Sequence, residues 1–238
     1  MLRLDKFLCE ANLGSRSQVK EYLKQGLVSV NGEIIKRPEH KVDETKDRIC
    51  CRGKEIVYRK YVYYMLNKPK DVVSSTRDSM CRTVSELLAD TGYDDLFPVG
   101  RLDKDTEGLL IMTNDGNLAH NLLSPKKHVE KVYYAELRKP LSEEDRKALE
   151  TGVDIGEEKL TLPAKAEQIT ETGLYLTIME GRYHQVKRML HAVGNEVIYL
   201  KRISMGKLSL DKNLPCGSYR ELTEEEVRSI GGRGTTGG

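Results

Sequence analysis

One stretch of the sequence, residues 98–116, constrains the fold more than any other. It carries a cluster of charged side chains beside two glycines and runs directly into the apolar segment 109–112, which we interpret as a buried strand. The charged side chains would then lie on a loop that a core strand holds rigid, a common place for chemistry. Residue types alone also fit a solvated, salt-bridged loop. The charged residues are Arg101, Asp103, Lys104, Asp105, Glu107 and Asp115.

Charge is unevenly distributed along the 238 residues, although the net charge is only +2. Residues 181–207 contain six cations and one acid, a local charge of +5, whereas residues 141–160 contain seven acids and three bases, a local charge of −4. A basic patch on a nearly neutral protein is typical of a surface that binds a polyanion on one face, although a merely solvated basic surface has the same composition.

Several classes of protein are disfavoured by the composition. The five cysteines include no CxxC pair and have no histidine at ligand spacing, so we expect reduced thiols and no zinc site. His184 and His191 lie seven residues apart with no carboxylate or cysteine at ligand spacing, which argues against any other metal. No apolar run approaches the ~20 residues that span a membrane. We therefore expect a cytoplasmic protein that does not contact membranes.

The first 57 residues predict two helices followed by a hairpin. Apolar residues recur at helical spacing through residues 3–12, and Ser15 with Gln18 forms a capping box for a second helix. The alternating segment 28–34 contains Asn31-Gly32, the sequence most typical of a tight hairpin turn.

Three cations of the second helix recur every four residues and line one of its sides, which suits contacts to phosphates that position RNA without reading its sequence. They are Arg16, Lys20 and Lys24.

Two further motifs follow the charged loop. Residues 131–137 alternate as a strand, with Lys131 and Tyr133 on one face. Residues 180–190 begin with a glycine turn and continue into a helix that we expect over residues 184–193. The start of such a helix combines free N–H groups with side-chain cations, a favourable place for an anion. Between the two motifs, Ser142 caps a predicted acidic helix over residues 143–150.

These three motifs, in this order, resemble those of RNA pseudouridine synthases of the RsuA-type ribosomal branch. The eleven residues Gly100-Arg-Leu-Asp-Lys-Asp-Thr-Glu-Gly-Leu-Leu110 match the family signature without a gap. The resemblance implies that Asp103 is the catalytic residue and that Tyr133 contacts the target base. It also implies that a cation of the third motif pairs with Asp103; the alignment favours Lys187, and Arg188 is the alternative.

The resemblance assigns further side chains to substrate binding. Arg101 would fill the gap left by the flipped base or hold a phosphate, and the patch from Arg182 to Arg188 would grip the RNA backbone. The remaining residues assigned to this group are Lys131, His184 and Gln185.

The helix–helix–hairpin resembles the S4-like RNA-binding domain, through Leu4-Asp-Lys-Phe-Leu8, Gly14-Ser-Arg-Ser17 and Val28-Ser-Val-Asn-Gly32. Together the resemblances imply an α+β protein, in which a small RNA-binding domain precedes a catalytic domain on a mainly antiparallel mixed sheet with flanking helices. We place the first domain at 1–57, a linker at 58–61, the catalytic domain at 62–230 and a disordered tail at 231–238.

The reaction implied is the isomerisation of uridine to pseudouridine in ribosomal RNA, which needs no cofactor. The opening segment and residues 123–131 look more like the small-subunit enzymes than the large-subunit ones. The expected partner is ribosomal RNA or a partly assembled subunit, bound by a monomer with no obligate protein partner. The alternatives are a large-subunit synthase, an RNA-binding assembly factor without activity, and a nucleoside hydrolase that uses the carboxylates between Asp103 and Glu107.

Overall fold

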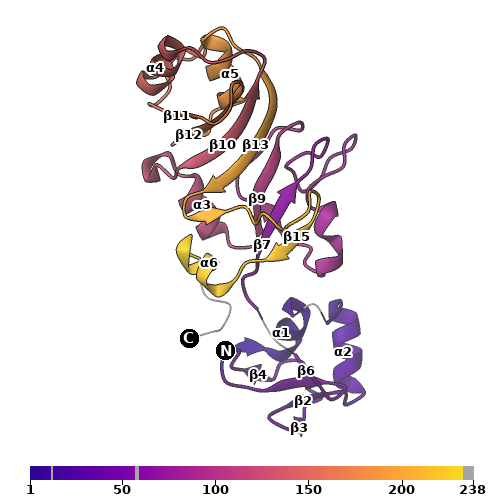
Figure 1. Cartoon of the computed structure of the whole chain (residues 1–238). Helices are drawn as coiled ribbons and strands as arrows, with labels where there is room; N and C mark the ends of the chain where they lie inside the picture. Colours follow the sequence, from indigo (N-terminus) through magenta and orange to yellow (C-terminus); the bar gives the residue numbers. More distant parts are fainter. Residues whose placement is uncertain (12, 57–58, 233–238) are drawn as a thin grey trace. The chain divides into compact units, whose positions relative to one another are not determined.

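The computed structural model describes residues 1–11, 13–56 and 59–232, and the chain divides into two compact units, Met1–Val62 and Tyr63–Gly232 (Figure 1). The predicted linker 58–61 lies partly, and the predicted tail 231–238 mostly, outside the described residues. Within the described residues, none of the helices has the length and apolar character needed to cross a membrane.

The first unit packs two helices against a small sheet. Helix α1 (Leu4–Glu10) and helix α2 (Arg16–Lys24) precede a four-stranded sheet in the order β3-β2-β5-β6. The strands are β2 (Val28–Val30), β3 (Glu33–Ile34), β5 (Ile49–Cys51) and β6 (Lys54–Glu55), and β1 (Leu2–Arg3) pairs separately with β4 (Lys41–Val42).

Local sequence signals account for this unit. Ser15 and Gln18 form the predicted capping box, and Asn31 and Gly32 both adopt positive φ, +52° and +90°, as a tight hairpin turn requires. The core consists of apolar side chains from both helices and the sheet, among them Phe7 and Ile49. The predicted helix–helix–hairpin is confirmed.

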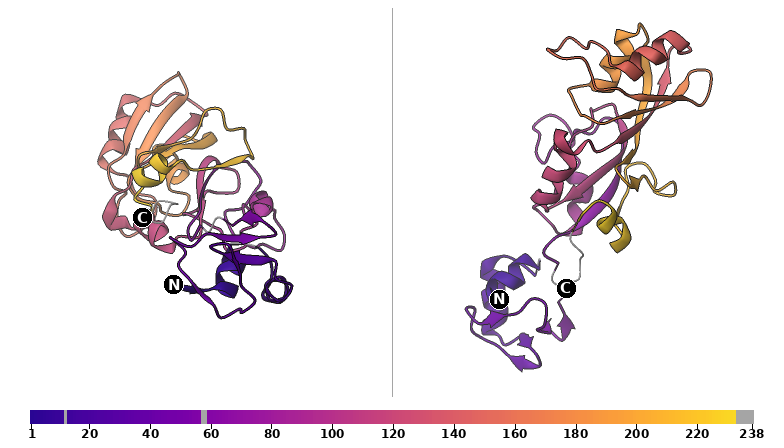
Figure 2. Two further views of the ribbon diagram at one scale, coloured as in Figure 1. Left: turned by 90° about the horizontal axis from the view of Figure 1, so that it is seen from below. Right: turned by 90° about the vertical axis from the view of Figure 1, so that its left-hand side faces the viewer.

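The second unit is built on one large mixed sheet in the order β11-β12-β10-β13-β9-β7-β15, with β8 and β14 paired at its side. Its strands are β7 (Tyr63–Lys68), β8 (Phe97–Pro98), β9 (Glu107–Thr113), β10 (Lys131–Leu137), β11 (Lys165–Gln168), β12 (Gly173–Ile178), β13 (Val197–Met205), β14 (Leu208–Ser209) and β15 (Tyr219–Glu221). Strands β9 and β13 are parallel and the other paired strands are antiparallel, which confirms the predicted fold class. Figure 2 shows the long strands β10 and β13 side by side from two further directions.

Short helices lie between these strands and, in the case of α6, after the last of them. They are η1 (Glu86–Thr91), α3 (Gly116–Leu123), η2 (Pro125–Lys127), α4 (Glu143–Thr151), α5 (Gln185–Ala192) and α6 (Glu224–Ser229). Asp115 caps α3 and accepts a hydrogen bond from the Tyr63 hydroxyl at 2.9 Å, so this charged residue of segment 98–116 belongs to the core. Ser142 and Asp145 form the predicted capping box of α4.

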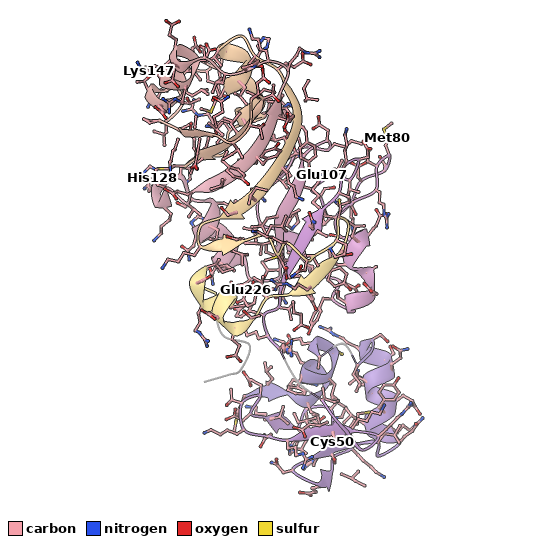
Figure 3. The ribbon with its side chains drawn as sticks, viewed as in Figure 1. Cys50, Met80, Glu107, His128, Lys147 and Glu226 are labelled. Atoms are coloured by element: carbon pink, nitrogen blue, oxygen red, sulfur yellow. The ribbon has the colours of Figure 1, made fainter. Side chains whose placement is uncertain are left out.

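The central strands are held by apolar burial on both faces. All six residues of β7 are buried, and in β9 every residue after Glu107 is buried. Burial of this kind stabilises a fold by roughly 25 cal/mol for each Å² of apolar surface removed from water. The loop that precedes β9 is therefore attached to the most rigid part of the unit. Figure 3 labels Glu107, the residue at which loop and strand meet.

Candidate active site

The loop before β9 is fixed by hydrogen bonds at both of its ends. The Val99 amide donates to the carbonyl of Ile111 at 2.8 Å. The buried hydroxyl of Ser74 donates to the carbonyl of Leu102 at 2.8 Å and accepts from the Leu102 amide at 3.0 Å. Beyond it, the Thr106 amide donates to the carbonyl of Asp103 at 3.0 Å and closes a turn. The backbone of Asp103 therefore has little freedom.

Lys68, at the end of β7, holds the same loop from within the core. Its side chain is fully buried, and its ammonium group donates to the carbonyls of Pro69, Lys104 and Thr106 at 2.9, 3.2 and 2.9 Å. Burial lowers the pKa of Lys68 to about 8, against the nearby carboxylate charges that raise it. We did not predict this residue as part of the site; the available signal was a lysine that directly follows an apolar strand.

The third motif supplies the groups that face Asp103. Nε2 of His184 lies 3.4 Å from one carboxylate oxygen of Asp103, and Nζ of Lys187 lies 3.8 Å from the other. Lys187 also contacts both oxygens of Asp105, at 2.5 and 2.7 Å. His184 directly precedes α5 and Lys187 lies in the first turn of α5, so both groups come from the start of this helix. The carboxylate of Asp103 thus meets an imidazole and an ammonium group.

His184 itself departs from the predicted helix. Its φ is +47°, in the left-handed region, and α5 begins one residue later at Gln185. Only a few per cent of residues other than glycine adopt such a φ, and they concentrate at functional sites. We connect this backbone conformation with the position of the imidazole beside Asp103.

Arg188 points away from Asp103. Its guanidinium group donates to Glu157 at 2.6 Å, to the carbonyl of Tyr183 at 3.0 Å and to the carbonyl of Ile155. The structure therefore brings Lys187, and not Arg188, to the carboxylate of Asp103.

Arg182 is bound in the same internal way. It donates to Glu180 at 3.0 Å and to the carbonyls of Lys159 and Leu160 at 2.7 and 2.8 Å. We expected the patch from Arg182 to Arg188 to grip phosphates. The two arginines at its ends instead fasten the segment before α5 to the loop that follows α4, because acidic partners distant in the sequence are folded against them.

Two other predicted substrate-binding side chains are also engaged within the protein. Gln185 is buried, donates to Glu180 at 2.8 Å and accepts from the Arg182 amide at 2.9 Å, which fixes the turn before α5. Lys131 is buried and donates to the carbonyl of Val129 at 3.0 Å. Burial, followed by the nearby charge of Arg202, lowers the pKa of Lys131.

Tyr133 lies level with the beginning of β9 in the sheet, with strand β13 between them. It pairs with Arg202 of β13, and Arg202 pairs with Gly108 of β9. Tyr133 is only 8% exposed. Gly108 has a φ of +101°, and a Cβ atom there would lie 2.3 Å from the carbonyl oxygen of Arg202, so the close approach of these two strands requires glycine. Arg101 is exposed on the loop.

Glu107 is engaged by a partner from β13. The hydroxyl of Tyr199 donates to its carboxylate at 2.7 Å, and burial together with this bond raises the pKa of Tyr199. This carboxylate is therefore occupied as an acceptor, which argues against the second catalytic acid that a hydrolase of the Asp103–Glu107 cluster would need.

A hollow opens beside the side chains of His184 and Lys187. Its volume is about 290 Å³, and its lining includes His184 just before α5, Lys187 and His191 on α5, and Asn195 and Glu196 after it. Within the described part of the chain, no group of three or more histidine, cysteine or acidic side chains could hold a metal ion. The site offers an anchored carboxylate, an ammonium group and an imidazole at the end of a central strand of a rigid sheet.

Comparison with known proteins identifies this arrangement. The family model described as RNA pseudouridylate synthase matches residues 62–192, and that of the S4 domain matches residues 2–49. The chain belongs to the RNA pseudouridylate synthase family. The enzymes of this family isomerise uridine to pseudouridine, so the chain is an RNA pseudouridine synthase with an N-terminal S4 RNA-binding domain.

The similarity to other pseudouridine synthases extends over both units. A Bacillus subtilis protein described as an uncharacterized RNA pseudouridine synthase, YtzG, is 52% identical to this chain. The aligned region covers 96% of this chain and 98% of the B. subtilis protein. Ribosomal small subunit pseudouridine synthase A of Vibrio cholerae is 44% identical, with 96% and 99% covered. A crystal structure of a pseudouridylate synthase, 39% identical, superposes with a TM-score of 0.68 over 97% of this chain and 100% of that one.

Proposed function

We propose that this pseudouridine synthase acts on one uridine of small-subunit ribosomal RNA, with Asp103 as its catalytic carboxylate. The likeness to enzymes named for the small subunit supports the substrate. The geometry that carries the assignment of Asp103 is its position between His184 and Lys187, at 3.4 and 3.8 Å, on a loop that Ser74 and Lys68 hold. We propose further that the enzyme works as a monomer in the cytoplasm, on ribosomal RNA or a partly assembled subunit.

The reaction moves one bond and one proton. The bond from C1′ of the ribose to N1 of the uracil breaks, the base rotates, and C1′ bonds to C5, which loses its proton while N1 gains one. Cleavage develops positive charge on the ribose, which a carboxylate stabilises through a covalent bond or through space. Asp103 supplies that carboxylate, and the ammonium group of Lys187 balances its charge when the substrate excludes water.

The target base must leave its stack before it can rotate. Extrusion costs a few kcal/mol, which stacking and hydrogen bonds in the pocket offset. In this proposal the ring of Tyr133 packs against the uracil, and the exposed Arg101 fills the gap in the RNA or holds a phosphate. Arg16, Lys20 and Lys24 of the S4 domain are exposed and contact phosphates farther along the RNA.

The test compares the wild-type protein with Asp103→Asn on unmodified small-subunit and large-subunit rRNA transcripts and on partly assembled subunits. We expect pseudouridine at one position of the small-subunit RNA with the wild type and none with the variant, and RNA affinities within a few-fold of each other, because one loop carboxylate adds little to the binding of a polyanion. Asp94→Asn, which changes an exposed loop carboxylate elsewhere in the same unit, should remain active.

Each other outcome points to a different function. Release of free uracil would indicate a hydrolase, and binding without any product would indicate an assembly factor. Turnover by Asp103→Asn above a few per cent of the wild-type rate would rule out Asp103 as the catalytic carboxylate. Product only in the large-subunit RNA would leave the enzyme class intact and change its substrate.

A further inference from the structure

Tyr183 presents one bare face of its ring at the entrance to α5. Its side chain is 74% exposed, an unusual fraction for a large aromatic residue in a folded unit. The other face lies on the imidazole of His184, with ring centroids 3.9 Å apart and planes 17° from parallel. The two rings form a short stack that ends in solvent on the tyrosine side.

The backbone that carries this stack is held in place. The carbonyl of Tyr183 accepts a hydrogen bond from Arg188 at 3.0 Å, and Arg188 is itself bound to Glu157 at 2.6 Å. On the other side, the amide of Arg182 is bound to the side chain of the buried Gln185 at 2.9 Å. The exposed ring therefore sits on a rigid support, so little conformational entropy is lost when a ligand binds to it.

The stack begins at the catalytic carboxylate. Nε2 of His184 lies 3.4 Å from Asp103, so the sequence of groups from the site outwards is carboxylate, imidazole and phenol ring. His184 and Lys187 also line the hollow of about 290 Å³ on α5. A flat aromatic surface thus stands directly outside the imidazole that faces Asp103, on the segment that leads to Lys187.

We propose that the exposed face of Tyr183 stacks on the base of a nucleotide next to the target uridine. Unpaired RNA bases are commonly bound by stacking on aromatic side chains, whereas paired bases are covered by their neighbours in the helix. The subsite thus selects a target uridine with an unpaired neighbour. Stacking tolerates any base, so this contact tests the structure of the RNA more than its sequence. The inference rests on the proposed function, because it requires RNA as the substrate.

The test uses the full-length enzyme and a small-subunit rRNA fragment around the mapped pseudouridine, in forms that carry an abasic site at one neighbouring position at a time. Tyr183→Ala and Tyr183→Leu remove the flat ring, and Tyr183→Phe keeps it. Ile169→Ala is the matched control: it removes exposed apolar surface just beyond β11, at the opposite end of the β11–β12 pair from Lys165 and Thr177.

We expect Tyr183→Ala and Tyr183→Leu to raise KM at least tenfold with a much smaller change in kcat, and Tyr183→Phe and Ile169→Ala to resemble the wild type. An abasic site at one neighbouring position should raise the wild-type KM to a similar extent and should add little in Tyr183→Ala, because both changes remove the same contact. If Tyr183 had only a structural role, the effects of Tyr183→Ala and of an abasic site on KM would multiply at every neighbouring position of the RNA.

The outcomes separate this inference from the proposed function. Wild-type enzyme that forms no pseudouridine on any of the RNAs contradicts the proposed function. If the wild type is active and Tyr183→Leu binds the fragment equally well, only the stacking subsite is wrong. Should Tyr183→Ala fail to fold, as judged by circular dichroism, the Leu and Phe variants with the abasic series still decide the question.

Discussion

The ammonium group of Lys187 is bound by both carboxylate oxygens of Asp105, at 2.5 and 2.7 Å. It lies farther, 3.8 Å, from the nearest oxygen of Asp103. Lys187 is thus shared between two carboxylates of one loop, and the carboxylate that holds it more closely is not the proposed catalytic one. We infer that Asp105 orients Lys187 and leaves Asp103 free to meet the substrate.

The first prediction concerns Asp105→Asn. A neutral amide holds an ammonium group less strongly than a carboxylate does, so Lys187 should lose its fixed position, and kcat should fall by about tenfold while RNA affinity stays equal or improves. Single-turnover kinetics at saturating RNA would measure the change. An unchanged kcat would show that Asp105 has no positioning role.

The same variant has a pH signature. Burial alone would raise the pKa of Asp105, but the hydrogen bond and charge of Lys187 outweigh burial and lower it below its ordinary 3.8. A lowered pKa in the folded state adds stability that is present above pH 3.8 and is lost as the pH falls through the lowered value. The difference in urea midpoint between wild type and Asp105→Asn should therefore shrink only below about pH 4.

The second prediction contrasts Lys187→Met with Arg188→Met. Loss of Lys187 leaves two neighbouring carboxylates without their cation, and we expect the rate at saturating RNA to fall more than a hundredfold. Loss of Arg188 removes bonds to Glu157 and to two carbonyls, so its main effect should be a lower unfolding temperature. Paired measurements of kcat and of thermal unfolding would distinguish the two, and the reverse pattern would exchange their roles.

The third prediction concerns Lys68→Met. Three carbonyls on and near the loop of Asp103 would lose their donor, at about 1–3 kcal/mol for each buried group left unsatisfied. We expect kcat to drop at least tenfold with little change in RNA affinity, and Lys70→Met, an exposed neighbour, to serve as the control. A kcat of Lys68→Met equal to that of the wild type would show that the loop does not need this support.

The lowered pKa of Lys68 also predicts that the free energy of unfolding changes with pH in the alkaline range. Its folded pKa of about 8 lies below the ordinary 10.5, so between these values the unfolded chain binds a proton that the folded protein has lost. The unfolding free energy therefore gains a contribution as the pH rises from 8 to 10.5. Urea unfolding at several pH values should show this gain in the wild type and not in Lys68→Met.

Much of the fold followed from short-range signals. The capping boxes at Ser15 and Ser142 and the Asn31-Gly32 hairpin depend on residues at most three positions apart, so the sequence contains all the necessary information. The strand after the charged loop followed from an apolar run of suitable length. These features were predicted where they occur.

The features that were missed depend on residues far apart in the sequence. Glu157 folds back onto Arg182 and Arg188, and two of the three carbonyl partners of Lys68, those of Lys104 and Thr106, lie 36 and 38 residues away. Neither pairing leaves a periodic trace in the sequence.

The left-handed backbone of His184 was also missed, because a positive φ in a residue other than glycine is imposed by its surroundings.

The fourth prediction concerns the S4 domain. Arg16→Gln, Lys20→Gln and Lys24→Gln, combined in the full-length chain, remove three exposed cations from one side of α2 and should weaken RNA binding. Each lost phosphate contact should reduce the slope of log affinity against log salt by about 0.7–0.9. The same slope as the wild type would contradict the proposed RNA contact of this helix, and kcat at saturating RNA serves as the control for the catalytic unit.

The parallel pairing of β9 with β13 also orders events during synthesis. The strand that follows the loop of Asp103 is complete at Thr113, but its neighbour β13 spans Val197–Met205, and β15 closes the other side of β7 later still. The N-terminal unit, by contrast, draws its core from the first 51 residues. Because domains generally fold as units and N-terminal ones first, a nascent chain acquires its RNA-binding module well before its catalytic sheet can close. While still attached to the ribosome that makes it, this protein passes through a stage in which it can hold RNA and cannot yet modify it.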